Sequence, residues 1–471
     1  MICVLIAAGC VRFWNLGSKS LWTDEAVSAI LATSSVSDFW QIITRHEPNM
    51  TFYYAALRAE VFLFGDTEAA LRSLSVAAGI LSVLALYRLG KQLFDERTGR
   101  IVALLVALSP LHISYSQEAR SYSFLILFSI LATSQLIDGL DSGRFYPWCG
   151  YVAASTLGMY SHVLFALVLA SHVAVLGLSP RRKLLCPHFI GALASVTALS
   201  MPLAYWMLVG SPSTSHIAWI TETPLHGLAS LITSTAGPDG QALLTIYALL
   251  VVSAVYMARR NFAESKLPVL CVLLAVPILI SFAVSWHTRI LIPRYLSFSL
   301  PPFLLLVGRG IALMPNRWLF VSSYGIVVSL SLQQDFLYQR LRANPGFSDD
   351  WRGTVYHVAE NAQAGDSMVF PYAFERIPVY YYLERDKNEE WKQTSLFPES
   401  SVQDLMFQPM PELTDARIAQ LALQHKRIWT LSAIAPNEHI LRVQRMFPTS
   451  CVPSTMRNFG TVHVELMVCG P

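Results

Sequence analysis

Residues 267–286 read LPVLCVLLAVPILISFAVSW, a stretch without a charged side chain. An α-helix needs about 20 predominantly apolar residues to cross the hydrocarbon core of a bilayer, so this stretch predicts a transmembrane helix. The whole chain has the same character: 54% of its 471 residues are hydrophobic, only 14% are charged, and the mean hydropathy is +0.44. Soluble proteins average about 45–50% apolar and about 25% charged residues, so the composition indicates a membrane protein.

Similar apolar segments lie on both sides of this one. They are found near residues 73–93, 101–116, 121–138, 148–160, 163–178, 189–209, 241–257, 295–314 and 318–333. Each is long enough, with tilt or a kink, to cross or nearly cross a bilayer. Residues 1–16 lack the basic start of a signal peptide and are interpreted as a further helix. We therefore expect a mainly α, polytopic helical membrane protein with about eleven transmembrane helices.

The distribution of Lys and Arg between alternate loops predicts the orientation. Basic residues gather in the loops near residues 95–100, 181–183, 259–266 and 317, whereas residues 211–240 contain neither Lys nor Arg. Since cytoplasmic loops are enriched in Lys and Arg, the first set is expected inside the cell. The loop after the first helix and everything beyond residue 334 then face outward. This pattern predicts a multi-pass protein of the inner (plasma) membrane.

The sequence changes character after residue 333, with many charges, several prolines and no further apolar span. The predicted elements there are a helix over 349–361, a turn at 364–366, and strands over 367–370, 428–433 and 461–468. We predict two domains. Residues 1–333 form the membrane domain, including an outer loop at 17–72 with surface helices near 25–33 and 36–45. Residues 334–471 form a small α/β domain on the outer face.

Net charge and cysteine spacing exclude some classes of function. The net charge of +3 is too mild to indicate nucleic acid as a partner. The seven cysteines have spacings that match no zinc or redox motif. Cys451 and Cys469 lie in the polar C-terminal region and would form a disulfide only in an oxidising compartment, so the sequence leaves their state open.

Ionisable residues at the outer helix ends are the candidates for function, because such groups are costly near a membrane. They are Asp24 and Glu25, His46 and Glu47, Glu118 and Arg120, His162, and the segment 289–294 with Arg294 at its end. A carboxylate can take a proton from an acceptor hydroxyl as a general base. Arginine suits a phosphate leaving group, since its planar fork pairs with two phosphate oxygens. Both residue types on one membrane face predict a site for a lipid-phosphate substrate.

Structural interpretations stand beside these functional ones. Asp24 could cap the helix that begins at Glu25. Glu118 and Arg120 could form an interfacial ion pair. His162 could be a packed interfacial side chain, and the aromatic run 52–54 is interpreted as part of an interfacial belt.

Several motifs, taken in order, resemble bacterial glycosyltransferases of the GT-C fold. They are Ser20-Leu21-Trp22-Thr23-Asp24-Glu25-Ala26, Glu47-Pro48-Asn49-Met50, Tyr115-Ser116-Gln117-Glu118-Ala119-Arg120, Tyr160-Ser161-His162 and Pro293-Arg294-Tyr295-Leu296. The resemblance is to the family 39 branch, which includes protein O-mannosyltransferases and aminoarabinose transferases. It spans nearly the whole chain and is densest over residues 20–122.

This resemblance implies an inverting transfer of a sugar from a polyprenyl-phosphate donor to an acceptor on the outer face of the membrane. Asp24 matches the proposed catalytic base of the family, with Glu25 in support. Arg294 matches an arginine that faces the carrier phosphate, and Arg120, Glu118, Tyr295 and His162 are further substrate-binding candidates. His46 and Glu47 match a stretch that in relatives holds a divalent metal or positions substrate. Many members have His-Pro-Pro there, so Glu47 departs from the pattern; no other cofactor is implied.

The sequence thus predicts a membrane glycosyltransferase whose partners are a polyprenyl-linked sugar, membrane lipids and a lipid, glycan or protein acceptor. Two alternatives remain. A transporter or flippase would carry charged or broken-helix features near the midplane in two matching halves, whereas here the charges cluster at the outer face. A non-catalytic binder of polyprenyl-linked glycans would share the fold without the reaction.

Overall fold

The structure, a computed structural model, describes residues 1–178, 182–210, 223–262, 265–343, 349–385, 395–397, 413–433 and 443–470. The chain divides into two units. The first, here called the membrane unit, comprises Met1–Leu16, Ser35–Gly65 and Ala70–Gln339. The second, the C-terminal unit, comprises Gly17–Ser34, Asp66–Ala69 and Arg340–Pro471.

This division differs from a boundary at residue 333, because residues 17–34 and 66–69 of the predicted outer loop belong with the C-terminal residues. Long-range hydrogen bonds within the C-terminal unit account for the difference. Ser20 Oγ donates to the carbonyl of Asp349 at 2.6 Å and accepts the backbone N–H of Trp351 at 3.2 Å. Arg352 also forms an ion pair with Glu68 at 3.0 Å. These bonds join residues 17–34 and 66–69 to the segment that begins at residue 349.

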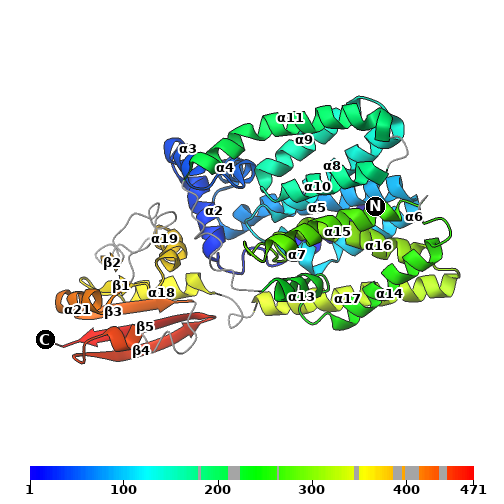
Figure 1. Cartoon of the computed structure of the whole chain (residues 1–471). Coiled ribbons are helices and arrows are strands. Elements are labelled where there is room, and N and C mark those ends of the chain that lie inside the picture. The colour runs from blue at the N-terminus through cyan, green and yellow to red at the C-terminus, as the bar shows by residue number, and fades with distance from the viewer. Residues whose placement is uncertain are drawn as a thin grey trace. The chain divides into compact units, whose positions relative to one another are not determined.

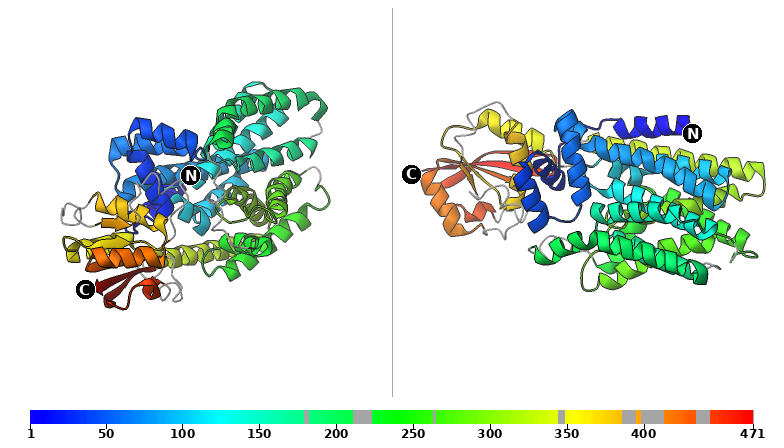
Figure 2. Two further views of the ribbon diagram at one scale, coloured as in Figure 1. Left: turned by 60° about the vertical axis from the view of Figure 1, so that its left-hand side comes forward. Right: turned by 90° about the horizontal axis from the view of Figure 1, so that it is seen from above.

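Helices make up the described part of the membrane unit, and the first two residues of α5 and the last four of α17 count with the C-terminal unit. They are α1 (Ile2–Phe13), α3 (Val36–Arg45), α4 (Thr51–Phe64), α5 (Glu68–Leu93), α6 (Glu96–Ala107), α7 (Pro110–Ser116), α8 (Tyr122–Ser142), α9 (Tyr146–Ser161), α10 (Phe165–Leu178), α11 (Arg182–Val209), α13 (Pro224–Ser234), α14 (Gln241–Ala258), α15 (Leu267–Val284), η1 (Ser297–Ser299), α16 (Leu300–Ala312) and α17 (Arg317–Ala343). The long helices lie side by side in a bundle (Figure 1), which Figure 2 shows from two further directions.

Every predicted apolar segment coincides with helix, although fewer than eleven helices of the described residues are long and apolar enough to cross a membrane by themselves. Among the described residues, five helices are long and apolar enough to cross a membrane, namely α5, α8, α11, α14 and α15. The bent pair α6 and α7 would make a sixth, and α1, α10 and the η1–α16 segment are apolar but shorter. The 16-residue α9 is too short, and α17 ends in a polar last turn with Arg340 and Arg342.

Two features shape the bundle at α6 and α16. Pro110 interrupts the predicted span 101–116, so that α6 and α7 meet at an angle of 60°. Glycines allow α16 to approach its neighbours: a β-carbon at Gly308 would clash with Val102 of α6, and one at Gly310 with the carbonyl of Leu250 on α14. Small residues at helix contacts are typical of membrane bundles, where close packing drives association.

The outer helices of the bundle expose apolar side chains. Leu208 on α11, Val252 on α14 and Leu279 on α15 are 82%, 64% and 66% exposed. Only 22–28% of the most apolar windows of these three helices is buried. Exposed apolar surface of this extent is stable when lipid covers it. The protein is accordingly a multi-pass membrane protein.

The C-terminal unit contains α2 (Thr23–Thr33) and an α/β fold. Its elements from residue 349 onward are α18 (Trp351–Asn361), β1 (Ser367–Val369), η3 (Ala373–Glu375), α19 (Arg376–Leu383), β2 (Ser395–Phe397), α21 (Asp415–Gln424), β3 (Arg427–Ser432), β4 (Cys451–Phe459) and β5 (Val462–Cys469). The strands form one sheet in the order β2-β1-β3-β5-β4. β1 pairs in parallel with β2 and β3, whereas β5 pairs antiparallel with β3 and β4.

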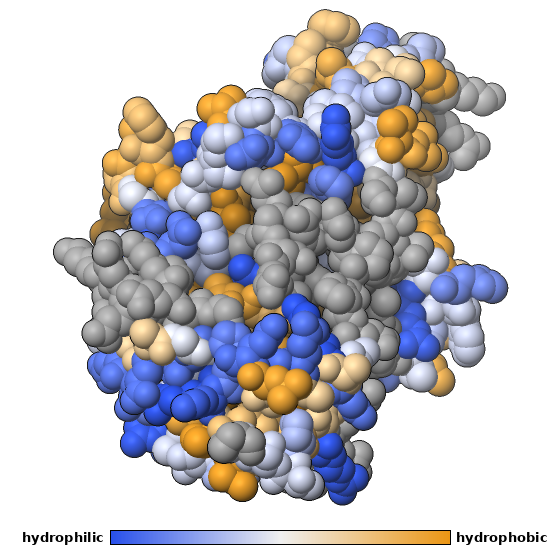
Figure 3. Space-filling view, turned by 90° about the vertical axis from the view of Figure 1, so that its left-hand side faces the viewer, coloured by the Kyte–Doolittle hydropathy of each residue, from blue (hydrophilic) through white to orange (hydrophobic). Residues whose placement is uncertain are grey.

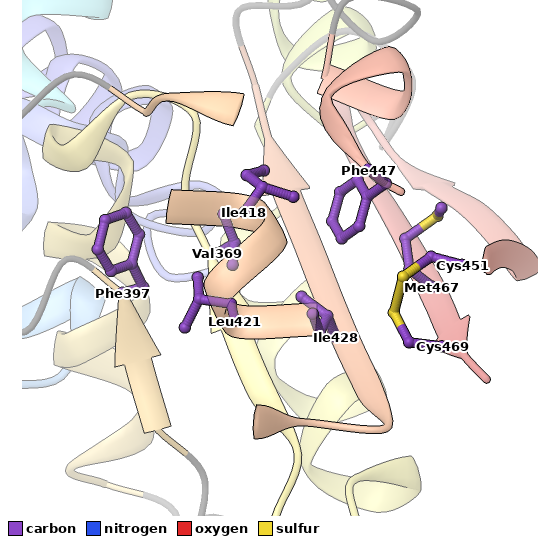
Figure 4. Close-up of a cluster of buried hydrophobic side chains, with 9 residues drawn as sticks. All are labelled: Val369, Phe397, Ile418, Leu421, Ile428, Phe447, Cys451, Met467 and Cys469. Atoms are coloured by element: carbon purple, nitrogen blue, oxygen red, sulfur yellow. A yellow bond between two sulfur atoms is a disulfide. The ribbon is translucent and has the colours of Figure 1, made fainter. Parts of the chain in front are cut away.

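Side chains alternate between the two faces of this sheet, so Ile428 and Trp429 of β3 point in opposite directions. On one face, Ile428 joins an apolar cluster with Ile418 and Leu421 of α21 (Figure 4). On the other, the ring of Trp429 lies 6.1 Å from His357 of α18. Trp429 also donates to Asp366 at 2.9 Å. The sheet is therefore covered by a helix on each face.

A disulfide joins Cys451 and Cys469, which face each other across β4 and β5. Both sulfurs border the apolar cluster of Figure 4. The two cysteines, whose state the sequence left open, are therefore bonded.

Figure 3 shows one face of the molecule coloured by hydropathy. Hydrophilic side chains cover much of this face, with smaller apolar patches between them.

Candidate active site

Asp24 and Glu25 lie in the first turn of α2, in different environments. Glu25 is 1% exposed, and its Oε2 accepts the backbone N–H of Trp22 at 3.4 Å. The side chain of Asp24 is partly exposed. The helix begins at Thr23, with Trp22 as its N-cap, so the alternative interpretation of Asp24 as the cap of a helix starting at Glu25 is wrong. Glu25 bonds the helix start, which leaves Asp24 as the accessible carboxylate.

The C-terminal residues hold the start of α2 in place. Tyr382 of α19 accepts the backbone N–H of Leu21 at 2.7 Å and donates to Glu68 at 3.1 Å. This hydroxyl is buried, as is the side chain of Leu21. The backbone that carries Asp24 is consequently anchored by an element more than 300 residues later in the chain. No sequence signal singled out Tyr382.

Arg120 lies in the short connection between α7 and α8 of the membrane unit. It is 8% exposed, and its Nη1 donates to Tyr54 Oη at 3.2 Å. Its carbonyl accepts from Ser75 Oγ of α5 at 3.0 Å. Glu118, in the same connection, is partly exposed. The connection thus presents a guanidinium and a carboxylate on a backbone bonded to α5.

His162 ends α9 and is almost fully buried, at 2% exposure. Its Nδ1 accepts the N–H of Leu164 at 3.2 Å, so the neutral ring carries its proton on Nε2. Among the described residues, Nε2 has no hydrogen-bond partner. Burial, and then the charge of Arg120, lower the pKa of His162 to about 3. His162 is therefore a neutral donor, whose proton is available to a ligand.

Arg294 and Tyr295 lie between α15 and η1, and both are partly exposed. The ring of Tyr295 lies 5.4 Å from that of His162, and the ring of Tyr122, on α8, lies 6.4 Å from that of His162. The charges of Glu118 and Arg294 both act on the buried Tyr115 of α7. The membrane unit therefore brings His162 and Tyr295 together, with the charge of Arg120 acting on His162 and the charges of Glu118 and Arg294 acting on Tyr115.

His46 and Glu47 follow α3, and both backbone N–H groups donate to the carbonyl of Ile42, at 2.8 and 3.0 Å. Burial and the neighbouring Arg45 lower the pKa of His46, which favours the neutral ring that metals bind. A metal site needs further ligands, and the described residues contain no group of three or more His, Cys, Asp or Glu that could hold an ion. Around His46 and Glu47 the described residues thus show no closed set of ligands, and metal binding at this stretch stays a prediction.

Tyr54 and Asn49, which contact Arg120 and the neighbour of His162, were not identified as site residues from the sequence. Tyr54 was interpreted as part of an aromatic belt, but it is 1% exposed and accepts from Arg120. Asn49 Oδ1 accepts the N–H of Val163 at 2.9 Å and so joins the loop after α3 to the residue beside His162. Met50, which follows, has a left-handed backbone with φ of 68°. Such a conformation costs about 1 kcal/mol or more in a non-glycine residue and is enriched at functional sites.

Comparison with known proteins identifies the fold. Residues 46–206 match the family model for dolichyl-phosphate-mannose-protein mannosyltransferase. ArnT from Cupriavidus metallidurans aligns over 100% of this chain and 98% of its own, with 13% identity and a TM-score of 0.65 in the apo state. In the structure bound to undecaprenyl phosphate, the TM-score is 0.66 at 12% identity, and 99% of ArnT is covered. The chain has the GT-C fold.

Two larger proteins contain the same fold. The archaeal oligosaccharyltransferase AglB from Archaeoglobus fulgidus, solved with an inhibitory peptide and a dolichol-phosphate, aligns over 91% of this GT-C chain and 69% of its own. The identity is 11% and the TM-score is 0.54. Arabinofuranosyltransferase AftD from Mycobacteria aligns over 99% of this chain and 40% of its own, with 14% identity and a TM-score of 0.54. No curated protein sequence matches the chain.

These comparisons confirm the predicted fold class, a polytopic GT-C-like helical protein with a small C-terminal sheet. The matched family segment includes His46, Glu47, Glu118, Arg120 and His162. Asp24, Glu25, Arg294 and Tyr295 lie outside it. The roles of individual site residues are not tested by the comparisons and stay predictions.

Proposed function

We propose that this protein transfers a sugar from a polyprenyl-phosphate carrier to an acceptor at the outer face of the inner membrane. The observation that carries the proposal is the alignment of the full chain with ArnT, whose structure holds undecaprenyl phosphate. Its support within the chain comes from Arg120, His162 and Tyr295, which offer a guanidinium and an imidazole N–H that has no hydrogen-bond partner in the described part of the chain. Such donors suit a phosphate.

The proposed reaction is a single displacement. Asp24 takes the proton of the acceptor group while the acceptor oxygen attacks the anomeric carbon of the sugar. The bond between that carbon and the phosphate oxygen breaks, and the electron pair leaves with the polyprenyl phosphate. Arg294 and Arg120 stabilise the charge of this leaving group, and the sugar inverts its configuration. Glu25, buried and bonded to Trp22, supports Asp24 by holding the first turn of α2.

The disulfide supports the proposed orientation. Disulfides persist in oxidising compartments, which lie on the outer side of the inner membrane. Cys451 and Cys469 are bonded, so we assign the C-terminal unit to that side. The basic residues of 95–100 and 259–266 agree with this assignment, since they fall in loops predicted to be cytoplasmic.

The acceptor, whether lipid, glycan or protein, is assigned to the C-terminal unit and the loop 211–240, of which residues 211–222 lie outside the described residues. Mass spectrometry of envelope glycans and glycoproteins, from cells with and without the intact protein, would identify the sugar and the acceptor. The proposal predicts that one sugar substituent disappears when the protein is lost.

The reaction itself is tested with purified protein and a labelled polyprenyl-phosphate sugar. An enzyme releases free polyprenyl phosphate in an amount equal to the sugar transferred. A transporter, flippase or glycan-binding protein releases none, because it leaves the bond to the sugar intact. Movement of the intact donor across a vesicle membrane without this release would favour the transporter and overturn the proposal.

A further inference from the structure

Arg12 of α1 is fully buried in the membrane unit. It is not one of the candidate site residues described above. All five N–H groups of its guanidinium have partners. Nε donates to Ser116 Oγ at 3.3 Å; Nη1 donates to the carbonyls of Ala8 and Ala107 at 3.1 and 3.0 Å. Nη2 donates to the carbonyl of Val106 at 3.1 Å and lies 2.7 Å from His112 Nδ1. Four of the five partners belong to the bent pair α6 and α7.

The reason for these bonds lies in Pro110. In an uninterrupted helix the carbonyl of Val106 would accept the N–H of residue 110, and proline has none. The carbonyls of Val106 and Ala107 therefore end α6 without the N–H donors of the next helical turn, although the carbonyl of Val106 accepts a long bond from the N–H of Ser109 at 3.4 Å. Within a bilayer, an unsatisfied carbonyl is costly, because no water is there to bond it. Arg12 donates to both of these carbonyls from another helix, and the charge of the buried Asp335 on α17 acts on its guanidinium.

A second set of bonds runs in the opposite direction. Gln117, the C-cap of α7, donates through Nε2 to the carbonyls of Arg12 and Trp14 at 2.9 and 3.1 Å, and more weakly to Val11 at 3.4 Å. These carbonyls belong to the last turn and exit of α1. Each element thus caps the C-terminus of the other: Arg12 caps α6, and Gln117 caps α1.

The α7 helix, held by these hydrogen bonds, is followed directly in the sequence by the proposed substrate-binding residues. Glu118 follows Gln117, and Arg120 is three residues beyond it. We infer that Arg12 is a positioning residue, which fixes the break at Pro110 and thereby the connection that carries Glu118 and Arg120. This inference rests on the proposed function for its consequence in catalysis, but its structural part can be tested without it.

The structural test is hydrogen exchange, measured by mass spectrometry on the full chain in lipid nanodiscs. Arg12→Met removes all five donors, and Arg12→Lys keeps the charge but loses the fork. The matched control is Arg309→Met, since Arg309 bonds to Asp95 at 2.6 Å, at the opposite end of α6. We expect exchange in residues 106–121 to rise about tenfold or more in R12M, and less in R12K. In R309M, the rise is confined to the start of α6.

Equal exchange in residues 106–121 of R12M and the wild type would overturn the inference, as would a uniform rise throughout the membrane unit. If R12M is not recovered in folded form, R12K takes its place, and exchange in residues 106–121 equal to that of the wild type would again overturn the inference.

The catalytic test is a double-mutant cycle on kcat/KM for the polyprenyl-phosphate sugar. Because Arg12 acts through the connection that carries Arg120, R12M should lower the activity of R120A by no more than about twofold, although it lowers that of the wild type about tenfold or more. Effects that multiply in the double variant would overturn the inference. A wild-type protein without transferase activity would refute the proposed function, while the exchange measurements would still decide the positioning role.

Discussion

The rings of His162 and Tyr295 lie 5.4 Å apart, although one ends α9 and the other precedes η1. Their contact joins two motifs that are far apart in the sequence. His162 also lies within the field of Arg120, whose charge acts on its ring. The proposed phosphate-binding group is therefore built from three separate connections between helices, and each contributes a side chain that can be changed independently.

Replacement of His162 tests whether its free N–H binds substrate. We expect H162A to lower kcat/KM for the polyprenyl-phosphate donor about fivefold to thirtyfold, the usual range for the loss of one buried hydrogen bond. The pKa of about 3 keeps the ring neutral, so the pH dependence between about pH 5 and pH 8 should be the same in H162Q and the wild type. If an ionisation near pH 6.5 disappears in H162Q, the neutral-donor assignment is wrong.

Arg294 and Arg120 are expected to bind the carrier phosphate. R294A and R120A should each lower kcat/KM about tenfold to a hundredfold, because a hydrogen bond to a charged group contributes about 1.5–3 kcal/mol. Lysine should restore only part of this loss, since it lacks the bidentate fork. R309A, at the ion pair with Asp95, serves as the control. Activity of R294A and R120A equal to that of R309A would remove both residues from the site.

The disulfide should stabilise the C-terminal unit. Cys451 and Cys469 are separated by 18 positions, and closing a loop of that size stabilises a fold by roughly 3 kcal/mol. We expect C451A/C469A to lower the urea concentration at which the C-terminal unit becomes sensitive to a protease pulse in the full-length protein. C149A, which removes an exposed free cysteine, should leave that midpoint unchanged. A midpoint equal in all three proteins would show that the bond contributes nothing.

Glu465 on β5 should make the stability of the C-terminal unit depend on pH. Burial raises the pKa of this carboxyl, an effect partly offset by the hydrogen bond from Gln444. The folded state thus holds the proton more tightly than the unfolded chain does. The stability that this provides is fully present below the unfolded pKa, near 4.3, and is lost as the pH rises through the folded pKa.

E465Q should therefore be more stable than the wild type at neutral pH and equally stable in acid. The measurement is the same protease-pulse midpoint, taken at about pH 4 and about pH 7. A variant less stable than the wild type at neutral pH would show that the ionised carboxylate is favourable in the fold.

Much of the fold is predictable from the sequence because its signals are local. The apolar segment 267–286 contains α15, and the segments 367–370, 428–433 and 461–468 coincide with β1, β3 and β5 to within a few residues. The number of full spans was less predictable. Pro110 breaks one apolar segment into two helices, and the 16-residue α9 is shorter than a bilayer requires.

Long-range contacts explain what the sequence could not predict. Residues 17–34 look like a loop of the membrane domain, yet Tyr382 and Ser20 bond them within the C-terminal unit. Tyr54 has the character of an interfacial residue, yet it is buried and bonded to Arg120. Arg12 resembles a charge near a helix end until its five bonds are seen. In each case the partner lies far away along the chain, where periodicity and motif spacing carry no information.

The central claim is that Asp24 acts as the base in sugar transfer. The most direct measurement compares transfer from a labelled polyprenyl-phosphate sugar by purified wild type, D24N and D38N. Asp38 is a suitable control because it also lies in the first turn of a helix, α3. We predict that the transfer rate of D24N is at least about a thousandfold lower than that of the wild type, which is the scale of general-base catalysis. Membrane insertion and stability of D24N should equal those of the wild type. D38N should keep the full rate. Transfer by D24N at the wild-type rate would contradict the account.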